Sequence, residues 1–303
     1  AYDILNVHEP SGAAAAMLRR VSARPRIIVT SHGIERRAWD LAREEARLGR
    51  GGPSRRARLW HPLTVLSQAR FALSLADHVL VLNSDDRAYL IDRLGRRPET
   101  VTRIWPGASE VYARAAVTRD YGAPRAILFS GTWRANKGIA DLVPAMRRVW
   151  QSRPDVTLTV LGAGADPAVI HAAFGDARVR VETAASDEAA AAVYGAHDLF
   201  VLPSLFEGTP LTLIEAMAGG LPCVTTRTCG MKDVVRDGEN GLLVPVRDPE
   251  ALARALLLVV ETPALAARLG RAAAADAAAC CTWSEAARPV LSVYESVDAF
   301  APA

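Results

Sequence analysis

No apolar run in this sequence of 303 residues reaches the roughly 18 residues that a membrane-spanning helix needs, so we expect no transmembrane segment. The four cysteines, Cys223, Cys229, Cys280 and Cys281, show no CxxC spacing and no accompanying histidine cluster. This pattern lacks the ligand spacing of a cysteine metal site and predicts reduced thiols in a cytosolic protein. The net charge is only +3, which excludes the strong overall positive charge typical of nucleic-acid-binding proteins.

The sequence also lacks an initial methionine and a recognisable signal peptide. It starts with Ala1, and residues 2–8 already have the pattern of a β-strand. We therefore expect the first domain to be truncated at its N-terminus, with its leading strands outside this sequence.

Positive charge is concentrated in one segment, although the net charge is small. Eight arginines lie between Arg36 and Arg58, against the three acids Asp40, Glu44 and Glu45, which gives a local excess of five positive charges. Such a segment is either a solvated helix and loop or a patch that faces an anionic membrane or acceptor. The second interpretation predicts peripheral contact with a membrane.

Strand-like and helix-like patterns alternate along the whole chain, which is typical of parallel α/β proteins. In the first part, strands are predicted at 3–8, 26–32, 78–83 and 101–105. Helices are predicted there at 11–20, 36–48, 61–76 and 84–94, with a glycine-rich loop at 49–54. The pattern then restarts, with strands predicted at 126–131, 157–162, 178–182, 199–203, 222–226 and 241–245 and a helix at 249–260.

This restart divides the chain into two Rossmann-like domains. Between Tyr112 and Pro124, alanine, arginine and glycine replace the periodic apolar pattern. We therefore place the incomplete first domain at residues 1–118, the second domain at 119–282 and a C-terminal helix at 283–303.

Polar residues and glycines gather at the predicted carboxyl ends of the strands, where open parallel sheets bind ligands. The first domain offers His8, Glu9 and His32 at these ends, and the second offers Gly131 and Gly162. A lone histidine such as His32 is often structural, but its place at a strand end before a glycine favours a role in ligand binding. Two domains of this kind would face each other across a cleft.

The segment FEGTPLTLIEAMAGG (206–220) predicts a short helix at about 210–218. Thr209 suits the N-cap, Pro210 suits the first helical position, and the glycine pair that follows ends the helix. The predicted buried stripe of this helix consists of Leu211, Leu213, Ile214, Met217 and Ala218.

Two acids belong to this segment: Glu207 in the loop before the helix, and Glu215 at the edge of the apolar stripe. A half-buried acid needs polar partners. Glu215 is therefore either a solvated edge residue or an acceptor for ligand hydroxyls. In the second case Glu207 would reach another part of the same ligand, while the helix N-terminus attracts its phosphates.

The segment SGTWRANKG (130–138) combines a strand end, a glycine turn, basic residues and a helix start, which is an arrangement that binds anions. Arg134 and Lys137 are its candidate cations, although a lysine at a helix start is also common on protein surfaces. The segment VLGAGADP (160–167) is similar to the dinucleotide-binding pattern GxGxxG, but Pro167 replaces the third glycine, which argues against a nicotinamide cofactor.

Together these motifs resemble the retaining glycosyltransferases of family 4 (glycosyltransferase group 1), which have the GT-B fold. The segments LFVLPSLFEGTPLTLIEAMAGGLPCVTT and GMKDVVRDGENGLLVPVRDPEALARAL are similar to the donor half of that family, and Glu207 and Glu215 meet its E-x7-E motif. SGTWRANKG is similar to the family's Gly-Arg-…-Lys-Gly loop, and NVHEP and VTSHG are similar to its acceptor-domain strands.

The resemblance implies roles for the matching residues. Glu215 would bind the ribose of a nucleotide sugar, and Lys137 would bind its diphosphate. The implied donor-binding residues are Gly131, Arg134, Lys137, Gly208, Thr209, Leu211 and Glu215. The implied catalytic residues are His32 and Glu207, and the acceptor-side candidates are His8 and Glu9. No metal and no cofactor are implied, and the donor would be a UDP- or GDP-sugar.

The resemblance has two departures. Thr132 stands where the family has an arginine, and we expect Arg134 to substitute for it. The family's first strand and its glycine-rich loop are absent from this sequence. The C-terminal segment 283–303 is similar to the family's closing helix, which crosses back to the first domain.

We therefore expect a retaining glycosyltransferase that moves a hexose from a nucleotide diphosphate sugar to a glycan, lipid or small-molecule acceptor. We expect it in the cytoplasm, with possible peripheral membrane contact through Arg36 to Arg58, and we expect no nucleic-acid partner. The alternatives are a nucleotide-sugar epimerase of the same fold and a pseudoenzyme that binds a nucleotide sugar without turnover.

Overall fold

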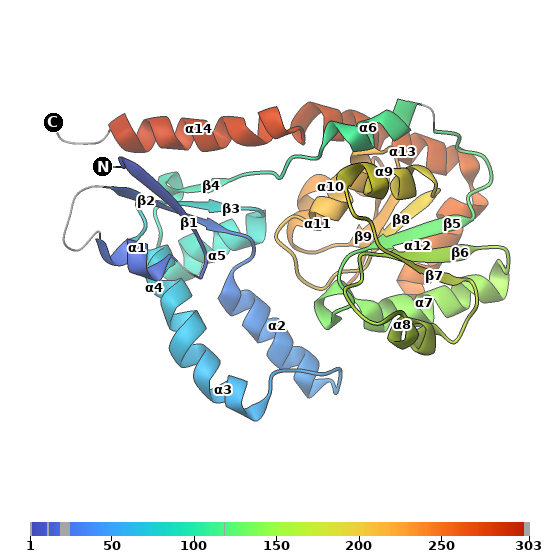
Figure 1. The fold of residues 1–303 in the computed structure, drawn as a ribbon, viewed down its shortest axis with the longest axis horizontal. Coiled ribbons are helices and arrows are strands. Elements are labelled where there is room, and N and C mark those ends of the chain that lie inside the picture. Colours follow the sequence, from blue (N-terminus) through green and yellow to red (C-terminus); the bar gives the residue numbers. More distant parts are fainter. Residues whose placement is uncertain (1, 11, 19–24, 118, 300–303) are drawn as a thin grey trace. The chain divides into compact units, whose positions relative to one another are not determined.

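The computed structural model describes residues 2–10, 12–18, 25–117 and 119–299. The chain divides into two compact units, which Figure 1 shows. Unit 1 comprises residues 1–105, 207–209 and 284–303, and unit 2 comprises residues 106–206 and 210–283. Each unit is built on one parallel sheet flanked by helices, which confirms the predicted α/β fold class.

Unit 1 contains a four-stranded sheet in the order β1-β2-β3-β4, with all neighbours parallel. Its strands are β1 (Ile4–His8), β2 (Arg26–Ser31), β3 (His78–Val81) and β4 (Val101–Arg103). Its helices are α1 (Ala13–Leu18), α2 (Glu35–Arg47), α3 (Arg55–His61), η1 (Pro62–Leu66), α4 (Ser67–Leu75), α5 (Ser84–Leu94), η2 (Pro98–Thr100) and α14 (Trp283–Ala299). All four strand predictions are confirmed, and α5 has the predicted bounds.

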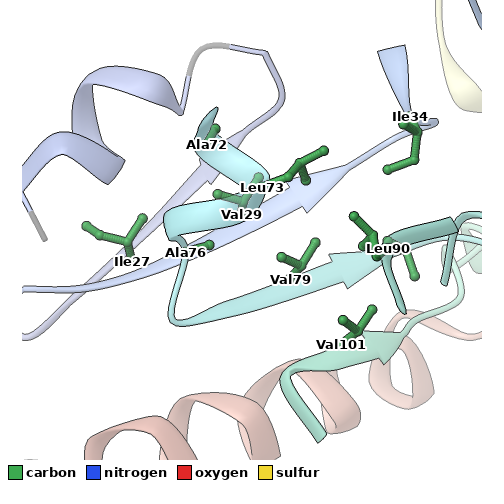
Figure 2. Packing of buried hydrophobic residues seen from close by; sticks show 10 residues of the cluster. Ile27, Val29, Ile34, Ala72, Leu73, Ala76, Val79, Leu90 and Val101 are labelled. Carbon is green, nitrogen blue, oxygen red and sulfur yellow. The ribbon is translucent and has the colours of Figure 1, made fainter. Parts of the chain in front are cut away.

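The core of unit 1 follows from the alternation of side chains along its strands. Figure 2 shows one face of the sheet, where Ile27, Val29 and Val79 pack with Leu73 of α4 and Leu90 of α5. Residues of the opposite parity, Ile28 and Leu80, pack on the other face with Val293 of α14. The C-terminal helix therefore covers the second face of this sheet.

Two helix predictions in unit 1 need correction. The helical region predicted at 61–76 begins earlier, at Arg55, because Ser54 caps α3 by accepting a hydrogen bond from the Ala57 amide at 3.1 Å. It then continues through the π-helix η1 into α4. Of the helix predicted at 11–20, positions 13–18 are helical, while residues 11, 19 and 20 lie outside the described residues.

Unit 2 contains a six-stranded parallel sheet in the order β10-β9-β8-β5-β6-β7. Its strands are β5 (Ala126–Ser130), β6 (Thr157–Leu161), β7 (Val179–Glu182), β8 (Leu199–Leu202), β9 (Cys223–Thr226) and β10 (Leu242–Val244). Its helices are α6 (Glu110–Val117), η3 (Ala135–Lys137), α7 (Ile139–Ser152), α8 (Pro167–Phe174), α9 (Asp187–Gly195), α10 (Leu211–Ala218), α11 (Cys229–Val234), α12 (Pro249–Glu261) and α13 (Pro263–Cys280). All six strand predictions are confirmed.

The strand order of unit 2 reverses between β5 and β8. The chain runs from β5 outward to β7, and then returns to the other side of β5 as β8. In open parallel sheets, the crevice outside the carboxyl ends of the strands at such a switch point is where ligands bind. The residues that follow β5 and β8 are therefore the first place to look for a site.

Unit 2 begins before the boundary that the sequence predicts after residue 118. Its first helix, α6, packs against α9, and the ring of Tyr112 meets the ring of Tyr194 edge to face at 5.2 Å. These contacts place α6 with unit 2, so the units divide at Trp105–Pro106. Residue 118 itself lies outside the described residues.

The start of α10 differs from its prediction. Pro210 occupies the N-cap position and the helix begins at Leu211. Thr209 is not the N-cap, because its hydroxyl donates a hydrogen bond to the Leu82 carbonyl within unit 1. Leu211, which the sequence places in the buried stripe, is 40% exposed, and Ala216 is buried instead.

None of the helices in the described segments is both long and apolar enough to cross a bilayer.

Candidate functional site

The loop after β5 holds Lys137 against a glycine. Gly131 has φ +149°, which an L side chain rarely adopts, and a β-carbon at this position would lie 3.5 Å from Lys137 Cε and 3.7 Å from Lys137 Nζ. The Gly131 amide donates to the Leu161 carbonyl at 3.0 Å, which fixes the loop on β6. The ammonium group of Lys137 therefore lies beside Gly131, directly after the end of β5.

Two contacts connect this loop to the loop after β8. The Leu205 amide donates to the Asn136 carbonyl at 2.7 Å. Gly138 has φ +70°, and a β-carbon there would lie 1.8 Å from the Pro203 carbonyl oxygen, so only glycine allows this approach. The loops that follow β5 and β8 therefore pack against each other. They do so at the switch point of the sheet, where the strand order predicts a ligand site.

Glu215 lies on α10 among aromatic side chains of unit 2. The Tyr194 hydroxyl donates a hydrogen bond to Glu215 Oε2 at 3.0 Å, and the Tyr112 hydroxyl also interacts with this carboxylate. Burial raises the pKa of Glu215, and hydrogen bonds from the two tyrosines oppose that rise. Burial likewise raises the pKa of Tyr112 and Tyr194, so both phenols stay protonated and act as donors.

Tyr194 also connects Glu215 to the end of β5. Its hydroxyl interacts with the Ser130 side chain, and Ser130 directly precedes Gly131. A continuous set of contacts therefore runs from Glu215 through Tyr194 and Ser130 to the loop that carries Lys137. No local sequence pattern marks either tyrosine as a partner of Glu215, because each approaches from a different helix.

The predicted residues of unit 1 gather at the carboxyl ends of β1 and β2. His8 Nδ1 and His32 Nε2 lie 2.8 Å apart, and the two rings stack with centroids 4.9 Å apart. One ring therefore donates and the other accepts the shared hydrogen. Burial, together with the neighbouring His8, lowers the pKa of His32, which favours its neutral form.

Glu9 follows His8 and is largely buried. Its Oε1 accepts a hydrogen bond from the Glu35 amide at 3.0 Å, at the start of α2. Burial raises the pKa of Glu9 to about 7, and the hydrogen bonds from the Ser31 side chain and the Glu35 amide oppose this rise only in part. Oε2 is buried and makes no hydrogen bond of standard geometry to any described residue.

The segment 207–209 also belongs to unit 1, and it contains Glu207, Gly208 and Thr209. Gly208 lies against His32, just after the end of β2. A β-carbon added to Gly208 would lie 2.4 Å from the His32 carbonyl oxygen. The Asn83 side-chain amide lies 3.4 Å from the Glu207 carbonyl oxygen and 3.3 Å from that of Gly208, and it donates to both. The predicted residues His32, Glu207, Gly208 and Thr209 are thus brought together.

A buried polar network that the sequence analysis missed supports this segment. Asn83 is fully buried and caps α5 by accepting from the Asp86 amide at 2.8 Å, while its Nδ2 donates to Asp86 Oδ2 at 2.8 Å. Asp86 pairs in turn with Arg37. The dipeptide Asn83-Ser84 at a strand end is the signal that could have pointed to this network.

Two predicted donor-binding residues are less enclosed than the others. Arg134 is exposed and is the N-cap residue of η3, and Leu211 is exposed at the start of α10. No side-chain hydrogen bond from Arg134 connects it to the predicted site among the described residues. The structure therefore places Lys137, rather than Arg134, directly over Gly131.

Each of the two units matches a known family of proteins. Residues 124–262 match the family model "Glycosyl transferases group 1", and residues 1–110 match the family model "Glycosyltransferase Family 4". The phosphatidyl-myo-inositol mannosyltransferase of Mycobacterium tuberculosis H37Rv is 30% identical over 308 residues, covering 98% of this chain and 74% of the relative. The enzyme of the same name from Mycobacterium leprae is 28% identical over 303 residues, with 98% and 74% covered.

Solved structures show the same fold. Sucrose-phosphate synthase from Thermosynechococcus elongatus superimposes with a TM-score of 0.80 at 24% identity, covering 99% of this chain and 75% of that protein. Anabaena Alr3699/HepE, solved in complex with UDP, gives a TM-score of 0.75 at 19% identity, covering 97% and 79%. The two parallel-sheet units therefore have the GT-B fold.

The chain belongs to the family 4 glycosyltransferases, the glycosyl transferases group 1. The family predicted from the E-x7-E motif and the SGTWRANKG loop is confirmed, and so is the prediction of an enzyme that transfers a glycosyl group.

Proposed function

We propose that this protein transfers a hexose from a nucleotide diphosphate sugar to a hydroxyl acceptor, with retention of anomeric configuration. The observation that carries this proposal is the arrangement in unit 2: Lys137 over Gly131 at the switch point, and Glu215 connected to the same strand end. A cation beside a glycine turn at a strand end suits a diphosphate, and a half-buried carboxylate suits ribose hydroxyls. The named activities of the relatives, mannosyltransferase and glycogen synthase, support a hexose.

The donor is proposed to be a UDP- or GDP-sugar that needs no metal and no further cofactor. A nucleotide sugar is supported by a protein with the same fold, because Anabaena Alr3699/HepE was solved with UDP and with UDP-glucose. We assign the diphosphate to Lys137 and the ribose hydroxyls to Glu215. Gly208 and Thr209 are assigned to donor binding through their backbone amides.

His32 and Glu207 are assigned to the transferred sugar. In the proposed front-face reaction, the acceptor oxygen forms a bond to the anomeric carbon as the bond to the leaving diphosphate breaks. The acceptor's proton passes to the leaving phosphate oxygen, so atoms and charge balance without an enzyme base. Lys137 stabilises the negative charge that develops on the diphosphate. A neutral His32 can hydrogen-bond the sugar without adding charge beside it.

Replacing Lys137 with alanine is expected to weaken binding of a nucleoside diphosphate more than binding of the nucleoside. Loss of a charge-assisted hydrogen bond costs about 1.5–3 kcal/mol, or roughly 10–150-fold in affinity, and the nucleoside lacks the phosphates that Lys137 would contact. Calorimetry with UDP and uridine, and with GDP and guanosine, measures both losses. The matched control is Lys232→Ala, because Lys232 is the other lysine of the sequence and lies exposed on α11. Equal losses for nucleotide and nucleoside would rule out a phosphate contact.

We also propose that the arginine-rich segment contacts an anionic membrane. The structure adds two observations to the charge excess. Apolar side chains beside the arginines are exposed, with Leu59 62%, Trp60 54% and Leu63 65% accessible. Arg43, Arg47 and Arg58 also line a cavity of about 540 Å³. Exposed apolar residues among basic ones are typical of surfaces that lie on anionic lipid. Arg37 does not take part, because it pairs with Asp85 and Asp86.

Binding to vesicles that contain phosphatidylglycerol is therefore expected to fall steeply between low and physiological salt, because exposed charges are screened beyond about 8–10 Å. A flotation assay measures the bound fraction. Leu63→Ala should reduce it, whereas Leu258→Ala, which truncates an exposed leucine of unit 2, should not. Absent or salt-independent binding would leave the arginine segment as an ordinary solvated surface.

A further inference from the structure

Two adjacent cysteines at the end of helix α13 form a close pair of thiols, which the donor assignments do not use. The sulfur atoms of Cys280 and Cys281 lie 3.1 Å apart. Cys280 is exposed at the surface, whereas Cys281 is only 2% exposed. The pair therefore combines one thiol that a dissolved oxidant can reach with a second, protected thiol in contact with it.

The hydrogen bonds of the pair give the two thiols different chemistry. Cys280 donates its S–H hydrogen to the Asp276 carbonyl at 3.1 Å, so the hydrogen bond between the two sulfurs is donated by Cys281. This hydrogen bond and burial raise the pKa of the Cys281 thiol, which therefore stays protonated. Since the thiolate is the form of cysteine that oxidants attack, Cys280 is the thiol that reacts first.

The end of α13 is paired with the segment that leads into helix α6. The Cys281 carbonyl accepts a hydrogen bond from the Ala108 amide at 2.8 Å, and Thr282 forms an isolated parallel bridge with Ala108. A β-carbon added to Gly107 would lie 2.7 Å from Trp283 Cα, so the two segments are in close backbone contact. A change of backbone at Cys281 is therefore transmitted to Ala108.

Ala108 in turn lies close to the proposed nucleotide site. Helix α6 begins two residues later, at Glu110, and carries Tyr112. The Tyr112 hydroxyl interacts with the Glu215 carboxylate, which we assign to the ribose. Contacts within unit 2 thus connect the cysteine pair to Glu215 through the start of α6.

A disulfide between adjacent cysteines changes the backbone that it spans. Consecutive Cα atoms are about 3.8 Å apart, whereas disulfides usually join Cα atoms about 4.4–6.8 Å apart. Closing the bond therefore forces the peptide between Cys280 and Cys281 out of its relaxed geometry. The Cys281 amide, which donates to the Ala277 carbonyl at 2.9 Å, moves with that peptide and turns the Cys281 carbonyl away from Ala108. A strained bond of this kind is also easily reduced, which suits a reversible switch.

We propose that Cys280 and Cys281 form a reversible thiol switch, in which peroxide joins them in a disulfide that loosens the start of α6 and weakens nucleotide binding. Hydrogen peroxide transfers one oxygen to the Cys280 sulfur, giving a sulfenic acid, and its other oxygen leaves as water. The Cys281 sulfur then bonds to the Cys280 sulfur, and the hydroxyl group leaves as a second water with the Cys281 proton. Two molecules of a small thiol reverse the reaction and leave as their own disulfide.

The chemical step is tested by treating the reduced whole chain with hydrogen peroxide and measuring its intact mass. Wild type is expected to lose two hydrogen atoms and to regain them with dithiothreitol. C280S should keep its mass, because the remaining thiol of the pair is buried. C281A should instead gain oxygen, because a sulfenic acid at Cys280 then has no partner and oxidises further. Cleavage after Arg271 gives a peptide that contains this pair and neither of the other two cysteines, which locates the bond.

The structural and functional steps are measured on the same oxidised protein. Hydrogen–deuterium exchange at the Ala108 amide should become faster, because its hydrogen bond to Cys281 is lost. Calorimetric affinity for UDP or GDP should fall by about two- to tenfold, the effect of weakening one hydrogen bond, and should recover with dithiothreitol. This last expectation rests on the proposed transferase function, because it concerns the donor site of that reaction.

The matched control is Ala279→Ser, which adds a hydroxyl beside Cys280 at an exposed position of α13 and keeps both cysteines. It should respond to peroxide as wild type does, whereas C280S should keep the nucleotide affinity of its reduced form. The proposal is overturned if wild type forms no bond within the pair, or if the disulfide leaves either Ala108 exchange or nucleotide affinity unchanged. Reduced wild type that binds neither nucleotide would contradict the transferase function instead, and the mass and exchange measurements would still decide whether the switch exists.

Discussion

Replacing Gly208 with alanine is expected to lower turnover of the nucleotide sugar by roughly 100-fold, because a displacement of about 1 Å near the reacting groups has effects of this size. The new β-carbon would lie 2.4 Å from the His32 carbonyl oxygen and 2.9 Å from Leu82 Cδ1, so segment 207–209 must move. That movement also stretches the hydrogen bonds that Asn83 donates to Glu207 and Gly208. Release of nucleoside diphosphate from UDP- and GDP-sugars measures the loss.

Gly195→Ala is the matched control for this substitution. Its added β-carbon would make only ordinary contact, 3.5 Å from Ala115 Cβ, and Gly195 is the last residue of helix α9. Turnover of the control should stay close to wild type. Calorimetry should show a smaller effect of G208A on the affinity for UDP or GDP than on turnover, because Lys137 and Glu215 lie in unit 2 and only the backbone amides of Gly208 and Thr209 are displaced. Turnover by G208A at the wild-type rate would show that the position of segment 207–209 does not matter for the reaction.

Replacing Glu215 with alanine is expected to weaken nucleotide binding by roughly 10–150-fold, which corresponds to the loss of one charge-assisted hydrogen bond to a ribose hydroxyl. The loss should be the same for the nucleoside diphosphate and the nucleoside, since both carry the ribose. This distinguishes Glu215 from Lys137, whose removal should weaken binding of the phosphorylated ligand more than binding of the nucleoside. Calorimetry with UDP and uridine, or GDP and guanosine, gives both values.

The controls for Glu215 separate ligand contact from structural damage. Removing its carboxylate takes away a hydrogen-bond acceptor of the Tyr112 and Tyr194 hydroxyls, so E215A should also lower the melting temperature. Tyr194→Phe removes one of these hydrogen bonds but not the carboxylate, and should reduce affinity less than E215A does. Glu250→Ala removes an exposed surface acid of α12 and should change neither quantity. An unchanged dissociation constant for UDP or GDP in E215A would contradict the assignment of Glu215 to the ribose hydroxyls.

The sequence predicts the parallel sheets of both units well, because buried parallel strands are short apolar runs bounded by glycine or polar residues. It also predicts α5 at Ser84–Leu94, whose Asn83 cap and following Gly95 mark both ends. In these segments, local patterns and tertiary packing favour the same structure.

The errors occur where a tertiary contact overrides a local preference. Thr209 has the sequence of an N-cap, but its hydroxyl bonds to Leu82, which is distant in the sequence, and Pro210 takes the cap position. Leu211 fits the helical stripe, yet it lies exposed at the first turn of α10. No local pattern carries information about a partner more than 100 residues away.

The same limit applies to the candidate site. Motif spacing makes Lys137, Glu207, Glu215 and His32 candidates, because the chemistry of each is visible in its own segment. The partners of these residues were not predictable in this way. Tyr194 reaches Glu215 from another helix, and the Asn83 network reaches segment 207–209 from the end of another strand.

We propose that unit 2 binds a nucleoside diphosphate through Lys137 and Glu215. Parallel calorimetric titrations of wild type, K137A and E215A with UDP and GDP test this binding mode. We expect wild type to bind at least one of the two nucleotides with a stoichiometry of one, and each variant to lose at least about tenfold in affinity, the lower bound expected for one charge-assisted hydrogen bond. Wild-type protein that binds neither nucleotide, or variants that bind as tightly as wild type, would contradict it.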